Sequence, residues 1–170
     1  MIFLTVWKSQ KVMERKEDAI QVLNDLLKIN NDRIREYRKA AKQIIDFDWR
    51  TLFLSMIDES KKFATELVLA ILQKGGVPHS ATTSGKIYRF WVEMKDTFTG
   101  MDRESILNEC EFVEDAALKA YNRALENEDL TAELALLISK QLESLHSSKL
   151  TLNRYRDMSL FDLYKVGIIK

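Results

Sequence analysis

Glu114 is the side chain of this sequence best placed to do chemistry, because it interrupts an apolar helical stripe where a carboxylate is out of place. The stripe consists of Leu107, Cys110, Ala117, Leu118 and Tyr121. A carboxylate buried among such residues needs a hydrogen-bonding partner, a proton or a metal ion. The position of Glu114 therefore indicates either a polar cluster or a metal site inside a helical protein.

The elements that must position this residue are helices. Apolar residues recur at alternating spacings of three and four, which predicts four long helices at about 17–45, 49–74, 102–127 and 130–156. Asp48 stands where it would cap the second of them. The connection between the second and third helices begins at the breaker Gly75-Gly-Val-Pro78 and contains one short amphipathic helix. The apolar side of that short helix is formed by Ile87, Trp91, Met94 and Phe98.

The lengths of the connections predict the topology. The order short, long, short indicates two antiparallel hairpins joined by a crossover, which is the all-α, ferritin-like four-helix bundle. We assign residues 17–157 to the bundle and 1–16 to an N-terminal extension, expected to be poorly ordered. Residues 158–170 form a tail with the composition of one further short helix.

The crossover places acidic residues at one height. It makes the second and third long helices parallel, and Glu59 and Glu114 lie about 11 and 12 residues after the respective helix starts. Counting from the two short turns brings Glu36 and Glu143 to a similar height. All four helices therefore offer an acid near the middle of the bundle.

The overall charge excludes long-range attraction to polyanions. Lys plus Arg and Asp plus Glu both number 26, so we expect neither nucleic acid nor an acidic membrane surface as a partner. Basic residues such as Arg33, Arg35 and Arg38 alternate with acids and are expected on a solvated helix face. No apolar run reaches the roughly 20 residues of a membrane span. The single cysteine, Cys110, favours a reducing compartment, and we expect a cytoplasmic protein.

The tail favours self-association, because its apolar content exceeds what one bundle obviously covers. We therefore expect a homo-oligomer, with Phe161, Leu163, Val166, Ile168 and Ile169 as the apolar residues concerned. The sequence has no glycine-rich phosphate loop, no serine or cysteine nucleophile motif and no paired-cysteine zinc spacing. These patterns favour a protein that is not an enzyme.

A family resemblance rests on several motifs. The strongest is Glu114-Asp-Ala-Ala-Leu-Lys-Ala-Tyr121, supported by Gly85-x-x-x-Arg89-x-Trp91 in the crossover. With these motifs the chain resembles, over about 17–157, a bacterial ferritin-like four-helix-bundle family known as a domain of unknown function. The resemblance implies the ferritin-like fold.

The chain departs from the family pattern at three positions. Tyr88 and Lys149 stand where members usually carry histidine, and Arg33 stands where many carry glycine. If either family histidine is a metal ligand, this chain has lost it.

A di-metal carboxylate site is one hypothesis for these residues. Bundles of this kind use one Glu from each of two helices and a Glu-x-x-His pair from each of the other two. The last long helix contains Glu143-Ser-Leu-His146, whereas Glu59-Ser-Lys-Lys62 offers an ammonium where an imidazole is needed. The candidate ligands for iron or manganese are Glu36, Glu59, Glu114, Glu143 and His146. This set is incomplete, and the helical phase turns Glu143 away from the stripe and leaves His146 at its margin.

The favoured hypothesis is a buried hydrogen-bonded layer without a metal. Inward positions are held by Asn30, Ser60, Glu114, Gln141 and Lys149. Such layers can fix helix register and pairing. The sequence thus predicts a non-catalytic bundle with a structural or interaction role, and the alternative is a metal-binding or redox ferritin-like protein.

Overall fold

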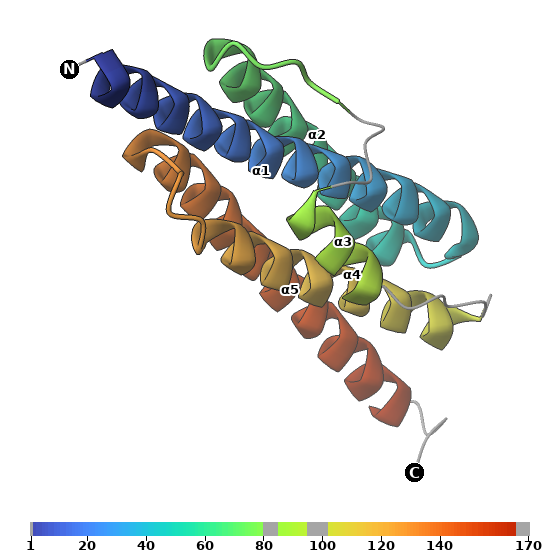
Figure 1. Cartoon of the computed structure of the whole chain (residues 1–170). Coiled ribbons are helices and arrows are strands. Elements are labelled where there is room, and N and C mark those ends of the chain that lie inside the picture. Colours follow the sequence, from blue (N-terminus) through green and yellow to red (C-terminus); the bar gives the residue numbers. More distant parts are fainter. Residues whose placement is uncertain (1, 80–84, 95–101, 166–170) are drawn as a thin grey trace.

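The computed structural model describes residues 2–79, 85–94 and 102–165, without the side chains of residues 2–5, 94 and 159–164 (Figure 1). These described residues form five helices and no strand, which confirms the all-α prediction. The helices are α1 Ile2–Gln43, α2 Phe47–Gln73, α3 Lys86–Met94, α4 Arg103–Leu125 and α5 Ala132–Lys165. Phe98 of the predicted crossover helix and the tail residues 166–170 lie outside the described residues, as do the side chains of Phe161 and Leu163.

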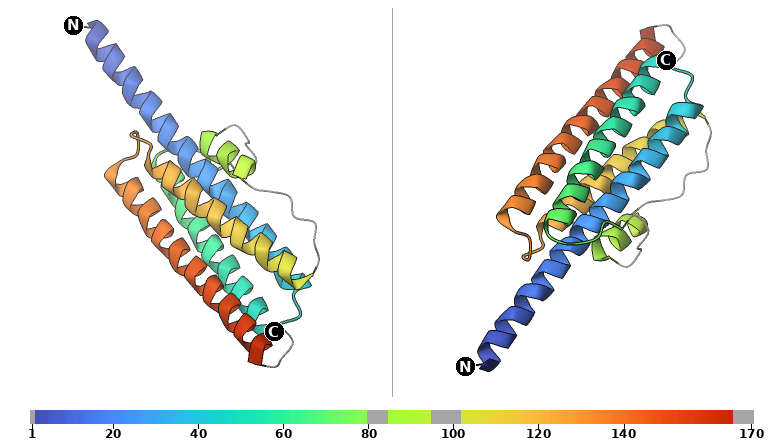
Figure 2. Two further views of the ribbon diagram at one scale, coloured as in Figure 1. Left: turned by 90° about the horizontal axis from the view of Figure 1, so that it is seen from below. Right: turned by 90° about the horizontal axis from the view of Figure 1, so that it is seen from above.

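The four long helices form two hairpins, α1 with α2 and α4 with α5 (Figures 1 and 2). The hairpins pack so that α1 contacts α4 and α2 contacts α5, while the crossover helix α3 packs on α1 and α4. The fold is therefore the ferritin-like four-helix bundle that the connection lengths predicted. In the part of the chain that the structure describes, no helix is long and apolar enough to cross a membrane.

Aromatic side chains fill the end of the core near the α1–α2 turn. Trp49 packs on Phe53 and Tyr155 with ring centroids 5.8 Å apart in both pairs, and Phe53 stacks on Tyr37 at 6.1 Å. Trp49 and Phe53 are fully or almost fully buried. This cluster holds α1, α2 and α5 together beside Tyr37, which points the hydroxyl of that tyrosine toward the middle of the bundle.

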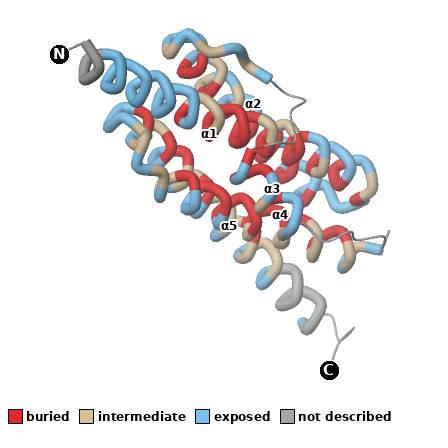
Figure 3. Tube along the Cα trace, in the orientation of Figure 1, coloured by how far each residue is buried: buried red, intermediate tan, exposed pale blue. Residues whose placement is uncertain are grey.

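Two helices are longer than the sequence pattern predicted. α1 begins at Ile2 instead of about residue 17, and its first turns project beyond the other helices with every described side chain from 6 to 18 exposed (Figures 2 and 3). Residues 2–17 contain no glycine or proline, so no helix breaker keeps α1 from extending toward the N-terminus. Likewise α5 continues without a break to Lys165. The division into extension, bundle and tail stays a prediction.

The ends of α2 follow ordinary capping chemistry, with one correction to the sequence analysis. The N-cap is Asp46, not Asp48: its carboxylate accepts hydrogen bonds from the backbone N–H groups of Asp48 (3.0 Å) and Trp49 (3.1 Å). At the other end Gly75 adopts a left-handed φ of 72°, which a residue with a side chain rarely adopts, and the helix stops.

The crossover helix α3 is held by two aspartates of α1. The Asp25 carboxylate accepts hydrogen bonds from the backbone N–H groups of Ile87 (3.0 Å) and Tyr88 (3.1 Å), so it caps α3 from a neighbouring helix. Asp32 accepts hydrogen bonds from the Tyr88 hydroxyl (2.9 Å) and the Trp91 indole N–H (3.2 Å). These bonds fix α3 on the face of α1 that carries Asp25 and Asp32.

Candidate functional site

The space between α1, α2 and α4 is occupied by the guanidinium group of Arg33, whose side chain is fully buried. Its Nη2 donates to Glu114 Oε1 at 2.6 Å and to Glu59 Oε2 at 3.3 Å. Its Nε donates to the same Glu114 oxygen at 3.2 Å, and its Nη1 donates to Asn30 Oδ1 at 3.3 Å. The Tyr37 hydroxyl donates to Glu114 Oε1 as well. One arginine thus pairs with two carboxylates from two other helices.

Helical spacing explains why α1 supplies three of these groups. Arg33 follows Asn30 by three residues and precedes Tyr37 by four, so the three side chains share one face of α1. The carboxylates arrive from α2 and α4 at the common height that the parallel crossover predicted. Glu59 and Glu114 therefore meet on one guanidinium.

Hydrogen bonds extend from this centre to the fourth helix. Asn30 Nδ2 donates to the Tyr121 hydroxyl at 2.7 Å, and that hydroxyl donates to Gln141 Oε1 on α5 at 2.8 Å. Gln141 Nε2 donates to Glu66 Oε2 on α2 at 2.8 Å. The hydroxyls of two further α5 residues, Ser144 and Ser148, donate to Glu59 at 2.7 and 2.8 Å.

We call this connected set the polar layer. It consists of Asn30, Arg33, Tyr37, Glu59, Glu66, Glu114, Tyr121, Gln141, Ser144 and Ser148. All four long helices contribute to it.

The electrostatics of the polar layer keep Arg33 charged and its neighbouring hydroxyl and thiol neutral. Burial alone would lower the pKa of Arg33, but Glu114, Tyr37 and Glu59 raise that pKa above its usual value. Burial, and then the charge of Glu114, raise the pKa of Tyr37 well above its usual range. Burial likewise raises the pKa of the Cys110 thiol. Tyr37 is therefore a neutral donor, and Cys110 is not a thiolate nucleophile.

One atom of the polar layer lacks a partner. Glu114 Oε1 accepts three hydrogen bonds, whereas Glu114 Oε2 is buried and accepts none from the residues that the structure describes. A buried carboxylate oxygen without a donor costs about 1–3 kcal/mol. This oxygen is the position in the polar layer where a water molecule or another donor would be stabilising.

The five predicted metal ligands do not all meet. Glu59 and Glu114 are joined by Arg33, while the side chain of Glu36 lies at the edge of the bundle, 13% exposed and 3.7 Å from Arg35. Glu143 and His146 are exposed on α5. The residues of α5 that reach Glu59 are Ser144, next to the predicted Glu143, and Ser148.

Two other residues that were predicted to point into the bundle, Lys149 and Ser60, have different outcomes. Lys149 is half-buried and forms an ion pair with Asp115 on α4, so it is not part of the polar layer and the prediction of an inward lysine was wrong. Ser60 is fully buried, but its hydroxyl donates to the backbone carbonyl of Met56 within α2.

The residue that the sequence analysis missed is Arg33, which it expected on a solvated face. A signal for its role was present: Arg33 lies between the inward positions Asn30 and Tyr37, and Glu114 needed a cationic or hydrogen-bonding partner. Local sequence does not say whether a long side chain flanking a stripe turns outward or reaches into the core.

A dinuclear metal centre does not fit these residues. It requires about four carboxylates and two imidazoles converging on the ions. Here two carboxylates converge on a guanidinium, which occupies the space between them and already supplies the positive charge. In the described ranges no group of three or more His, Cys, Asp or Glu side chains is arranged to hold a metal ion.

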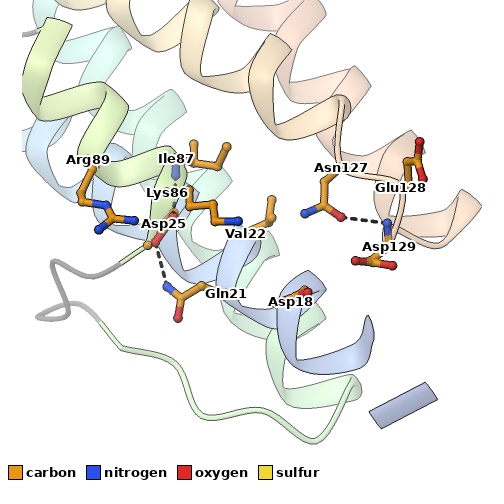
Figure 4. A pocket seen from close by; sticks show the side chains of 11 residues that line it. Asp18, Gln21, Val22, Asp25, Lys86, Ile87, Arg89, Asn127, Glu128 and Asp129 are labelled. Carbon is orange, nitrogen blue, oxygen red and sulfur yellow. Dashed lines mark hydrogen bonds between the residues drawn. The ribbon is translucent and has the colours of Figure 1, made fainter. Parts of the chain in front are cut away.

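A second polar feature is the cleft between α1, the start of α3 and the α4–α5 turn (Figure 4). Its wall contains Asp25, whose Oδ1 accepts a hydrogen bond from Gln21 at 2.8 Å while Oδ2 caps α3. Both carboxylate oxygens are therefore used in holding the fold.

Comparison with known proteins places this chain in a family. Residues 18–127 match a family described as Domain of unknown function (DUF2383), and this match covers more than half of the chain. The chain belongs to the DUF2383 family. The resemblance found in the motifs is thereby confirmed, and no curated protein sequence matches the chain.

Solved structures similar to this DUF2383 protein are ferritin-like. A Mycobacterium smegmatis Dps1 mutant has a TM-score of 0.73 at 14% identity and covers 84% of this chain and 97% of its own. A ferritin-like, diiron-carboxylate protein from Bacillus anthracis has a TM-score of 0.66 at 18% identity, covering 83% and 96%. A dodecameric thioferritin from Bacteroides fragilis, described as bacterioferritin-related, has a TM-score of 0.72 at 20% identity, covering 96% and 99%. At such identities the likeness shows the fold alone.

Proposed function

We propose that this ferritin-like protein is a non-catalytic bundle with a structural or interaction role, and that its polar layer fixes how the four helices pair. The observation that carries this proposal is the position of Arg33 between Glu59 and Glu114. A half-satisfied buried network is costly, so the polar layer favours the single helix register in which its members meet.

The chemistry of the layer supports a non-catalytic role. An arginine cannot lose its proton in a protein, so Arg33 is no general acid or base. The raised pKa values of Tyr37 and Cys110 keep both groups protonated, whereas a nucleophile or general base needs a pKa near or below the working pH.

Metal analysis tests the proposal against its competitor, an iron- or manganese-binding or redox protein. That alternative is favoured by the unpartnered Glu114 Oε2 and by the diiron-carboxylate protein among the similar structures. Protein is purified from cells supplied with iron and manganese, with Glu114→Gln as the matched variant. We expect far less than one metal ion per chain in both proteins. Stoichiometric metal that is lost in Glu114→Gln would replace the structural role with the metal-binding one.

The interaction role includes self-association in the cytoplasm. Support comes from the large apolar side chains that α2 and α5 expose, Leu54, Leu69, Leu72 and Leu136, each more than half exposed. The similar thioferritin is dodecameric, and the single buried thiol suits a reducing compartment. Sedimentation equilibrium at micromolar concentration is expected to give a defined oligomer, and a monomer at every concentration would contradict this part of the proposal.

A further inference from the structure

The polar layer has the composition of a cation-binding site. Two carboxylates, the buried Glu114 and the 14% exposed Glu59, point at one space, and Asn30 adds an amide oxygen. Without a cation in that space, the two negative charges would face each other in a medium of low dielectric constant. Arg33 supplies the cation from within the chain.

The shape of the site suits a planar cation. Nε and Nη2 both donate to one oxygen of Glu114, Nη2 also reaches Glu59, and Nη1 reaches Asn30. The Arg33 Cζ lies 5.7 Å from the centroid of the Tyr37 ring. Three acceptor oxygens, reached by different guanidinium nitrogens beside an aromatic ring, match the fork of a guanidinium group. A spherical metal ion would instead need oxygen atoms at about 2.0–2.6 Å on all sides.

We propose that the centre of this bundle is a guanidinium-binding site that Arg33 fills as a built-in ligand in the place of a metal. The inference deepens the proposed function, on which it rests in one respect: the wild-type chain has no need of a metal ion there. The ligand class that the vacated site would take is a small alkylguanidinium ion.

Arg33→Ala creates the vacated site, because it removes the side chain beyond Cβ. Ethylguanidinium has the same atoms as the part removed, with its ethyl group in place of Cγ and Cδ. Ethylurea is the matched control, since it is planar and of nearly the same shape but uncharged. Manganese chloride is the third probe and represents a divalent metal.

Thermal unfolding of full-length Arg33→Ala with each probe at millimolar concentration tests the inference. We expect ethylguanidinium to raise the midpoint by about 3 °C or more, as saturating binding to the folded state does. Ethylurea and manganese are expected to have little effect, and the wild-type midpoint should not rise with any probe. Equal effects of ethylguanidinium and ethylurea, or a larger effect of manganese, would overturn the inference.

A second variant keeps the test decisive if Arg33→Ala does not fold. Arg33→Ala/Glu114→Gln removes the uncompensated charge, so it is expected to fold without a ligand, while Arg33→Ala is expected to recover on refolding with ethylguanidinium. A cation site would be contradicted if the double variant did not fold without a ligand and Arg33→Ala did not recover with ethylguanidinium. The metal content of the wild-type protein decides the proposed function separately, so the two failures are distinguishable.

Discussion

At the scale of single residues, the buried pair Arg33–Glu114 explains how a carboxylate is tolerated in an apolar stripe. Each charge would be very costly alone in the core, and together they satisfy one another with Tyr37 as an additional donor. Such a pair contributes little net stability compared with apolar residues, but breaking it is costly. The role that we propose for it is therefore specificity of helix pairing.

Substitutions of the pair should be strongly non-additive. Arg33→Met is expected to cost about 3–5 kcal/mol, because it leaves Glu114 buried without a cation. Glu114→Gln should cost less, since Glu59 still accepts from Arg33. The double variant should recover much of the loss, as measured by urea unfolding. Lys149→Met is the control: its ion pair with Asp115 is partly exposed and is worth about 0–1 kcal/mol. Additive losses would show that the pair does not act as a unit.

Tyr88 gives a pH dependence with a defined sign. Burial, the hydrogen bond to Asp32 and the charge of Asp32 raise its pKa from 10.0 to about 12. The unfolded chain therefore releases this proton first, so stability is complete below pH 10.0 and falls as the pH rises toward about 12. In urea unfolding, Tyr88→Phe should lose less stability than the wild type across this window. Parallel curves for the two proteins would contradict the assignment.

Sequence reasoning reached Glu114 but not Arg33, and the physical reason is clear. A carboxylate within an apolar repeat is visible in the sequence, because the repeat itself reports the core-facing side. A long side chain beside a repeat can point either way, and only the approach of α2 and α4 decides it. The same limit applies to Lys149, which lies at an inward position yet reaches out to Asp115.

At the scale of elements, α3 depends on α1 for its N-terminal cap. Asp25 supplies that cap, and Gly85 lies so close to it that an added Cβ would overlap the carboxylate. The constraint that the structure shows on this glycine is therefore space. Although α3 lies within a long crossover, this cap holds it in one position on α1.

Gly85→Ala is expected to destabilise the protein by about 1–3 kcal/mol, because the new methyl group displaces the Asp25 carboxylate from the N–H groups of α3. In an Asp25→Ala background the same substitution should cost almost nothing, since the overlap is gone. Thermal unfolding of the four proteins of this cycle measures the difference. If Gly85→Ala cost the same stability with Asp25 present and with Asp25→Ala, the effect would not come from the overlap with Asp25.

Helix existence was easier to predict than helix ends. The long helices, the crossover helix and their pairing followed from apolar spacing and connection lengths. The start of α1 did not, because the described side chains of residues 6–16 are exposed, and apolar periodicity reports only helices that bury an apolar face. Asp46 and Asp48 are both plausible caps, and only backbone geometry separates them.

At the scale of the whole molecule, we expect the bundle and the projecting turns of α1 to be separable. The side chains of residues 6–18 are exposed, and they include Trp7 at 60% and Met13 at 58% (Figure 3). The bundle closes through side chains from residue 19 onward. We therefore expect the ferritin-like core not to depend on the first turns.

A chain that starts at Met13 should keep its stability within about 0.5 kcal/mol of the full-length protein, because the described side chains that it lacks, residues 6–12, are exposed. Thermal unfolding and sedimentation of the two chains side by side check this. A large loss of stability would mean that the projecting turns pack on a second copy of the chain.

The central claim is that Arg33, and not a metal ion, is the cation between Glu59 and Glu114. A crystal structure of the wild-type protein grown with excess manganese, with an anomalous difference map, tests it most directly. The account predicts density for the Arg33 guanidinium between Glu59 and Glu114 and no anomalous peak within coordination distance of either carboxylate. Manganese bound to both carboxylates, with Arg33 turned out of the bundle, would contradict it.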